Sequence, residues 1–190
     1  MGLMLAKYMN SFERRKILIH RMEELESQGM GCLGCPGTCC TFEANSMMIE
    51  PLEAFEIISY LKDKNLLNDE LKDQLKDSVT KFRLEHKPLK GKSYLRKTYT
   101  CPFFEYQELG CPLPREIKPY GCLAFDSHHP ELKASEHCYS EVELLERIDN
   151  QKNLNEEIKT KYQLYWDKSP IPTALLDLWD KINDVNQSPD

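Results

Sequence analysis

Eight cysteines in a chain of 190 residues are the side chains best suited to chemistry. They fall into a compact first group and a dispersed second group: Cys32, Cys35, Cys39 and Cys40, then Cys101, Cys111, Cys122 and Cys138. Soft thiolate ligands select zinc, copper(I) or iron–sulfur chemistry over magnesium or calcium. Eight thiols suffice for two four-thiolate sites, or for one cluster with thiols to spare. Their number and spacing therefore indicate a metal centre and leave the metal open.

The first group has the spacing of a metal-binding loop. Two residues between Cys32 and Cys35 allow both sulfurs to face one ion, since zinc–sulfur bonds are only about 2.3 Å long. The neighbouring Cys39 and Cys40 are harder to place, because adjacent side chains of an extended segment point to opposite sides. We therefore expect this pair either to serve two different sites or to supply one ligand and one packing residue.

Composition narrows the classes of protein. The formal net charge is −6, so non-specific binding of nucleic acid is not expected. No apolar run is long enough to span a membrane, and the first residues do not form a secretory signal. We therefore expect a cytoplasmic protein with no membrane partner. In that reducing compartment, clustered cysteines are more often metal ligands or redox thiols than structural disulfides.

Apolar periodicity predicts a mainly α fold in which several amphipathic helices pack around an irregular loop layer rich in cysteine and proline. The chain is expected to form one domain over residues 1–190. Helices are expected at about 7–28, from Pro51 through 61, at 69–82, at 141–166 with a break near Asn150, and at 172–185. The segment 101–138 carries five prolines, so long helices are not expected within it.

The position of the two middle helices has a consequence for the cysteines. A short turn near Asn65 joins them, and two helices so joined should run antiparallel and return the chain toward its start. We therefore expect Cys101 to lie near the loop that carries Cys32 to Cys40.

Three stretches resemble a known family, the YkgJ-type cysteine-cluster proteins: Cys32-Leu-Gly-Cys35-Pro-Gly-Thr-Cys39-Cys40, Ile49-Glu50-Pro51-Leu52-Glu53-Ala54, and Lys118-Pro119-Tyr-Gly-Cys122-Leu-Ala-Phe125. That family is described as a zinc- or iron-chelating domain with a CxxCxxCC core and four downstream cysteines. The resemblance covers about residues 31–138 and implies that all eight cysteines are metal ligands. Similar clusters occur in flagellin lysine methylases, which implies an iron–sulfur centre. Lys118 stands where the family usually has arginine.

Three classes of function remain open. The leading hypothesis is a metal-binding protein whose cofactor is zinc, iron or an iron–sulfur cluster, with no physiological role or protein partner assigned. The second is an oxidoreductase or modifying enzyme that uses such a cluster. The third is a metal-free thiol switch in which Cys39 and Cys40 act as attacking and resolving thiols.

Two further groups of residues carry weaker alternatives. His128, His129 and His137 could complete a mixed sulfur–nitrogen site, but eight cysteines already suffice as ligands. The basic run between Arg83 and Lys97 could dock an acidic partner or RNA, although a solvated connector is the expected role in an acidic chain. We find no nucleophile–base pairing, phosphate-binding loop or dinucleotide fingerprint.

Overall fold

Helices make up most of the part of the chain that the structure describes. The structure, a computed structural model, describes residues 11–28, 38–85, 97–105, 111–124 and 141–187. The α-helices are α2 (Ser11–Ser27), α3 (Pro51–Asp63), α4 (Asp69–Phe82), α5 (Tyr120–Leu123), α6 (Glu141–Tyr162) and α7 (Ile171–Gln187). A 3-10 turn, η1, covers Thr38–Cys40. Strands β1 (Met48–Ile49) and β2 (Ser169–Pro170) pair antiparallel, with Met48 opposite Pro170. The predicted mainly α fold is confirmed.

Local signals explain where the two middle helices begin and end. Helix α3 has Pro51 in its first turn and a capping box in which the side chains of Glu50 and Glu53 each accept the other's backbone N–H. Helix α4 begins after Asn68, whose side chain accepts the N–H of Leu71 at 2.9 Å. It ends at Arg83, which adopts the left-handed conformation with a φ of 52°. Both helices lie where the periodicity predicts them.

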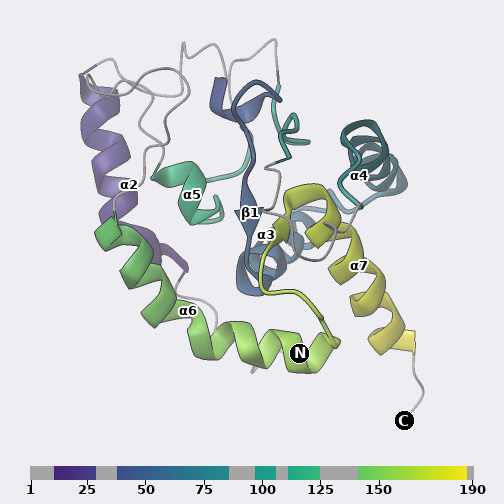
Figure 1. Ribbon diagram of the computed structural model, residues 1–190. Helices are drawn as coiled ribbons and strands as arrows, with labels where there is room; N and C mark the ends of the chain where they lie inside the picture. Colours follow the sequence, from purple (N-terminus) through teal and green to yellow (C-terminus); the bar gives the residue numbers. More distant parts are fainter. Residues whose placement is uncertain (1–10, 29–37, 86–96, 106–110, 125–140, 188–190) are drawn as a thin grey trace, which may run out of the picture.

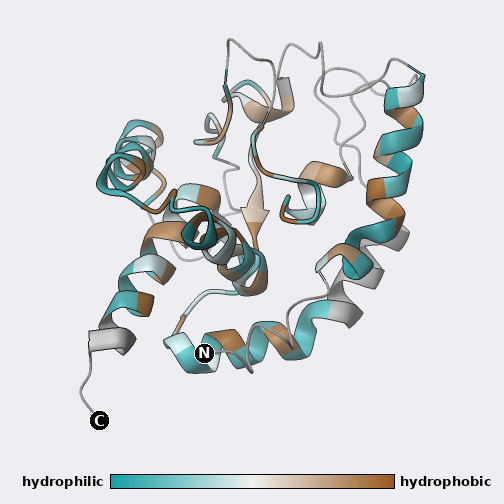
Figure 2. Cartoon of the chain, turned by 180° about the vertical axis from the view of Figure 1, so that it is seen from behind, coloured by the Kyte–Doolittle hydropathy of each residue, from teal (hydrophilic) through white to brown (hydrophobic). Residues whose placement is uncertain are grey.

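The main core gathers around α7. Leu175 and Leu178 of α7 are fully buried, as are Leu52 and Ile57 of α3. Helix α4 packs mainly against α7, and α3 packs against both α7 and α6, whereas α3 and α4 have little contact with each other. Figure 1 shows α4 and α7 together at one side of the molecule. The helices alternate apolar and polar colours along their length, as amphipathic helices do (Figure 2).

A smaller apolar cluster joins α2 to α5. Leu18, Ile19 and Met22 of α2 pack with Tyr120 and Leu123 of α5. Helix α5 thus lies between α2 and the strand β1 (Figure 1). It is the one helix in the described part of the proline-rich segment, and it is only four residues long, as the prolines predict.

The predicted break near Asn150 is wrong. Helix α6 runs without interruption from Glu141 to Tyr162, because a single asparagine costs a helix interior only a few tenths of a kcal/mol, about 0.7 at most. The helix also ends earlier than the predicted residue 166. Gln163 adopts a left-handed conformation with a φ of 51°, and the N–H of Leu164 returns to the carbonyl of Lys159 at 2.9 Å, which closes the helix.

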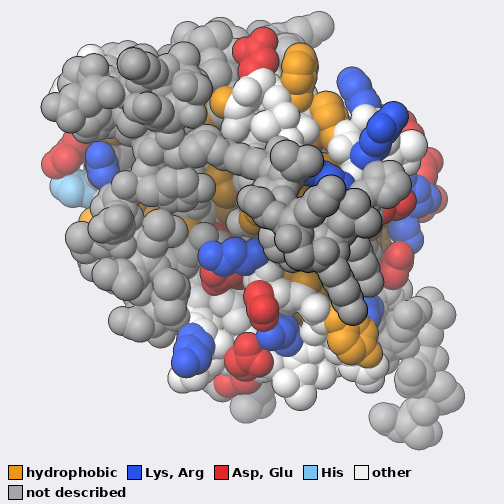
Figure 3. All heavy atoms as spheres, in the orientation of Figure 1, with side chains coloured by type: hydrophobic (Ala, Val, Ile, Leu, Met, Phe, Trp, Pro, Cys, Tyr) orange, Lys and Arg blue, Asp and Glu red, His pale blue; other side chains and the backbone are white. Residues whose placement is uncertain are grey.

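The described surface carries charged side chains of both signs, and acidic and basic side chains are intermixed on its visible part (Figure 3). None of the helices that the structure describes has both the length and the apolar character to cross a membrane. Residues 29–37, most of the basic run from Arg83 to Lys97, and the histidines His128, His129 and His137 lie outside the described residues.

Candidate metal centre

Five of the eight predicted ligands lie in the described chain, and none of the five is in a disulfide: Cys39, Cys40, Cys101, Cys111 and Cys122. The other three, Cys32, Cys35 and Cys138, lie outside the described residues. The first two described cysteines are on η1, and Cys122 is on α5. The site is therefore assembled from elements far apart in the sequence.

The two cysteine groups meet through their backbones. The N–H of Cys101 donates to the carbonyl of Cys40 at 2.7 Å, and the N–H of Tyr99 donates to the carbonyl of Asn45 at 2.9 Å. The prediction that Cys101 returns to the first cysteine loop is confirmed for Cys40.

Tyr99 fixes this junction from the core side. Its side chain is fully buried, and its hydroxyl donates to the carbonyl of Met47 at 2.6 Å. The same oxygen accepts the N–H of Ile171 at 3.0 Å, at the start of α7. One hydroxyl thus ties the segment before Cys101 to Met47, which precedes β1, and to the first residue of α7.

Four thiols influence one another electrostatically. Burial is the main reason that the pKa of Cys101 is raised, and the neighbouring charges of Cys111 and Cys40 raise it further. Burial likewise raises the pKa of Cys122 well above its ordinary value, with added effects of Cys101, Cys111 and Cys40. Lys118 opposes the shift in both cases. One desolvated region is therefore shared by four thiols: Cys40 of η1, Cys101, Cys111, and Cys122 of α5.

The adjacent pair behaves differently. The sulfurs of Cys39 and Cys40 lie 3.9 Å apart, because η1 is a tight turn and not an extended segment. The expectation that their side chains point to opposite sides is therefore wrong. The hydrogen bond from Cys39 is the main reason that the pKa of Cys40 falls to about 7, since burial opposes the shift and Lys118 assists it. Cys40 is the thiol best prepared to ionise among those whose pKa is resolved.

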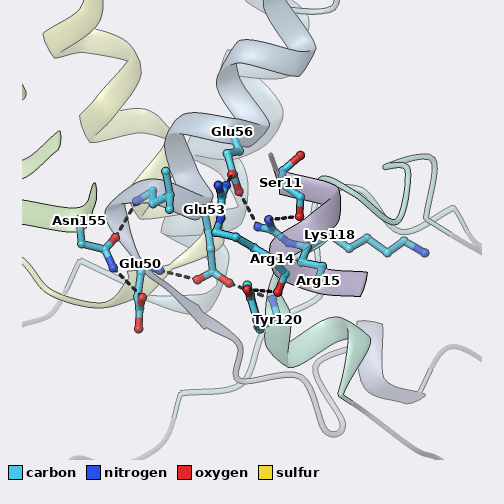
Figure 4. A network of polar contacts seen from close by, with 10 residues as sticks. Ser11, Arg14, Arg15, Glu50, Glu53, Glu56, Lys118, Tyr120 and Asn155 are labelled. Atoms are coloured by element: carbon cyan, nitrogen blue, oxygen red, sulfur yellow. Dashed lines mark hydrogen bonds and ion pairs between the residues drawn. The ribbon is translucent and has the colours of Figure 1, made fainter. Parts of the chain in front are cut away.

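Buried polar contacts hold α5 in place (Figure 4). Glu53 accepts the N–H of Tyr120 at 2.9 Å and the N–H of Glu50 at 2.8 Å. Arg15 donates through Nε to the carbonyl of Lys118 at 2.9 Å. These contacts were not predicted; the capping-box spacing of Glu50 and Glu53 is the sequence signal that could have marked Glu53 as buried.

A buried ion network continues from the same arginine. Arg15 pairs with Glu56 at 2.5 Å, and Arg14 also contacts that carboxylate. Burial is the main cause that raises the pKa of Glu56, against the opposing effect of Arg15 and Arg14. The network therefore connects α2 to α3 at a considerable desolvation cost.

Close packing reaches the residue next to Cys122. A Cβ atom added to Gly121 would lie 2.6 Å from the sulfur of Met47, so only glycine fits there without a shift.

Within the described residues, no three His, Cys, Asp or Glu side chains lie together in a group that could hold a metal ion. No protein-family model matches the chain, and neither curated proteins nor solved structures gave a match.

Proposed function

We propose that the protein binds zinc or iron through cysteine thiolates in this desolvated region, in a reducing, cytoplasmic setting. The observation that carries the proposal is that Cys40 and Cys101 are joined through their backbones and that Cys40, Cys101, Cys111 and Cys122, from separate segments, lie near enough to influence one another electrostatically. The described residues alone form no complete metal-binding group, so the proposed centre needs ligands beyond them. In the metal-free protein, burial raises the pKa values of Cys101 and Cys122 and so keeps these thiols neutral. A bound metal ion would reverse this, because it deprotonates coordinating thiols and stabilises the thiolates.

The distance between the sulfurs of Cys39 and Cys40 supports a site in which both thiolates bind one ion. With zinc–sulfur bonds of about 2.3 Å and a tetrahedral angle, two thiolates on the same ion lie about 3.8 Å apart. The sulfurs of Cys39 and Cys40 lie 3.9 Å apart. Zinc with four thiolates, or iron with two of them, fits this spacing. A four-iron cluster held by four thiolates fits it less well, because each iron then takes a single cysteine.

Lys118 supplies the positive charge that such a centre needs. Four thiolates on zinc carry a net charge of −2, which must be balanced by nearby cations or amides. Lys118 favours the ionised forms of Cys40, Cys101 and Cys122. Lys118 is therefore suited to balance part of the charge of the proposed centre.

The thiol switch is the alternative that the lowered pKa of Cys40 favours. Oxidation would join the sulfurs of Cys39 and Cys40, with two protons and two electrons passing to an oxidant such as hydrogen peroxide, which becomes two waters. The geometry of a neighbouring pair opposes this. Consecutive Cα atoms are about 3.8 Å apart, whereas disulfides usually need about 4.4–6.8 Å. We therefore favour metal binding.

Anaerobic purification followed by elemental analysis and absorption spectroscopy tests the proposal. We expect stoichiometric zinc in a colourless protein, or iron in a coloured one. A preparation with neither metal, and with no uptake of Zn²⁺ or of iron with sulfide, would overturn it. Facile formation of a Cys39–Cys40 disulfide in that preparation would establish the switch instead.

A pair of variants on α5 separates ligand loss from unfolding. Cys122→Ser removes a thiol with almost no change in volume, and we expect it to lose much of the metal. Leu123→Ala weakens the packing of the same helix, where Leu123 is buried, but removes no thiol. Metal content should therefore survive Leu123→Ala under conditions in which that variant is folded. Equal metal content in both variants would exclude Cys122 as a ligand.

A further inference from the structure

The start of α5 depends on contacts from other helices. A four-residue helix makes too few internal hydrogen bonds to define its own position. The N–H of Tyr120 instead donates to Glu53 of α3 at 2.9 Å, and the carbonyl of Lys118 accepts from Arg15 of α2 at 2.9 Å. The hydroxyl of Tyr120 also donates to the backbone carbonyl of Arg14. The helix is therefore placed by polar anchors at its first turn.

Glu53 is an anchor with rigid support. Its side chain is fully buried, and its second oxygen accepts the N–H of Glu50 at 2.8 Å within the capping box of α3. The neighbouring Ala54 and Ile57 are fully buried in the main core. The carboxylate thus cannot turn away from α5 without breaking the start of α3. Figure 4 shows it between the two helices.

This contact determines where Cys122 can lie. Cys122 follows Tyr120 by two residues, and its N–H donates to the carbonyl of Pro119 at 2.9 Å within the same turn. A shift of the Tyr120 N–H away from Glu53 would therefore carry the Cys122 thiol with it. Cys122 would then move relative to Cys40 and Cys101, which are held by their own backbone pairing.

We propose that Glu53 is a positioning residue of the metal centre, which fixes the Cys122 thiol by holding the first turn of α5. The proposal rests on the proposed metal-binding function. Residues that orient metal ligands without touching the metal typically change metal affinity by about 10–100-fold when replaced.

Glu53→Ala and Glu50→Ala form a matched pair for the test. Each substitution removes one half of the same capping box, so the two variants share the damage to the start of α3. Glu50→Ala also removes the acceptor of the Asn155 side chain at 2.7 Å and the partner of Lys168 at 3.7 Å, so it is the more disruptive of the two away from α5. Only Glu53→Ala also removes the acceptor of the Tyr120 N–H. Zn²⁺ affinity is measured against a competing chelator, and unfolding by denaturant is measured in parallel. Alkylation of Cys122 in the metal-free proteins is followed by mass spectrometry.

We expect Glu53→Ala to bind Zn²⁺ about tenfold more weakly than Glu50→Ala and to expose Cys122 to alkylation about tenfold faster. A residue with only a structural role would lower stability in both variants and leave these two readouts alike. Equal Zn²⁺ affinity and equal Cys122 labelling in the two variants would overturn the proposal.

The labelling also separates the two proposals. If the wild-type protein takes up no metal, the proposed function fails, and Cys122 labelling alone decides whether Glu53 positions the thiol. Glu53→Met serves if the alanine variant does not fold. Methionine keeps about the length of the side chain but removes both carboxylate oxygens, including the acceptor of the Tyr120 N–H. We expect Cys122 of that variant to label several-fold faster than in wild type, and wild-type labelling would overturn the proposal.

Discussion

Tyr99→Phe is the sharpest test of how the two cysteine groups are brought together. The substitution removes one oxygen from a fully buried side chain and leaves the ring in place. That oxygen satisfies the carbonyl of Met47 at 2.6 Å and the N–H of Ile171 at 3.0 Å. Phenylalanine therefore leaves two backbone groups without these partners.

The size of the expected loss of stability follows from how deeply each of the two backbone groups is buried. Ile171 is 1% exposed, so its stranded N–H should cost about 1–3 kcal/mol. Met47 is only half-buried, so its carbonyl should lose about 1 kcal/mol, the net value of an ordinary hydrogen bond. We expect the free energy of unfolding to fall by about 2–4 kcal/mol in total.

Denaturant unfolding of the metal-free protein measures this loss directly. Tyr165→Phe is the matched control, because Tyr165 is 89% exposed and the same change there should stay within about 0.5 kcal/mol of wild type. A Tyr99→Phe protein within about 0.5 kcal/mol of wild type would refute the reasoning. In that case the hydroxyl would not be what ties the Cys101 segment to α7.

Three further predictions concern the site itself. Lys118→Met removes a charge that favours three of the thiolates, and we expect about tenfold weaker Zn²⁺ binding in a chelator competition; unchanged affinity would show that another group balances the charge. In the metal-free protein, alkylation of Cys40 should have its midpoint near pH 7 and not near its ordinary pKa of 9.0. An alkylation midpoint near pH 9 would contradict this prediction. Because folding lowers the pKa of Cys40, the stability that its thiolate contributes is complete above about pH 9 and is lost as the pH falls through about 7. Gly121→Ala should cost about 1 kcal/mol by denaturant unfolding, because the flexible end of Met47 can move away, whereas a loss above about 3 kcal/mol would show that the backbone has to shift.

The helices were predictable because their signals are local. The spacing of Leu75 and Val79 marks the buried side of α4, and Asn68 marks its start. The failure at Asn150 has the same origin, because a weak local signal was given more weight than the continuous helix around it. Local periodicity also predicted that Cys101 would return toward Cys40, although it did not reveal α7 as the element that closes the core.

The internal arrangement of the site was less predictable. The relation of Cys39 to Cys40 depends on a 3-10 turn in a segment without periodicity, so the assumption of an extended chain had no local check. The hydrogen bond from Tyr120 to Glu53 joins residues 67 positions apart, and no local pattern announces such a contact. Sequence spacing can gather candidate ligands, whereas the contacts that orient them are tertiary.

The cost of the buried network indicates why these contacts matter. A pair such as Arg15 and Glu56 gains little net stability, because desolvation offsets much of its attraction, and apolar side chains could fill the same space as well. Apolar packing is non-directional, however, and it tolerates small sliding movements that hydrogen bonds do not. A thiol centre needs its sulfurs held to within a fraction of an ångström, on a helix too short to hold itself. In the proposed metal centre, directional contacts from Glu53 and Arg15 would meet that need, and bound metal would add stabilising energy to the irregular layer around α5.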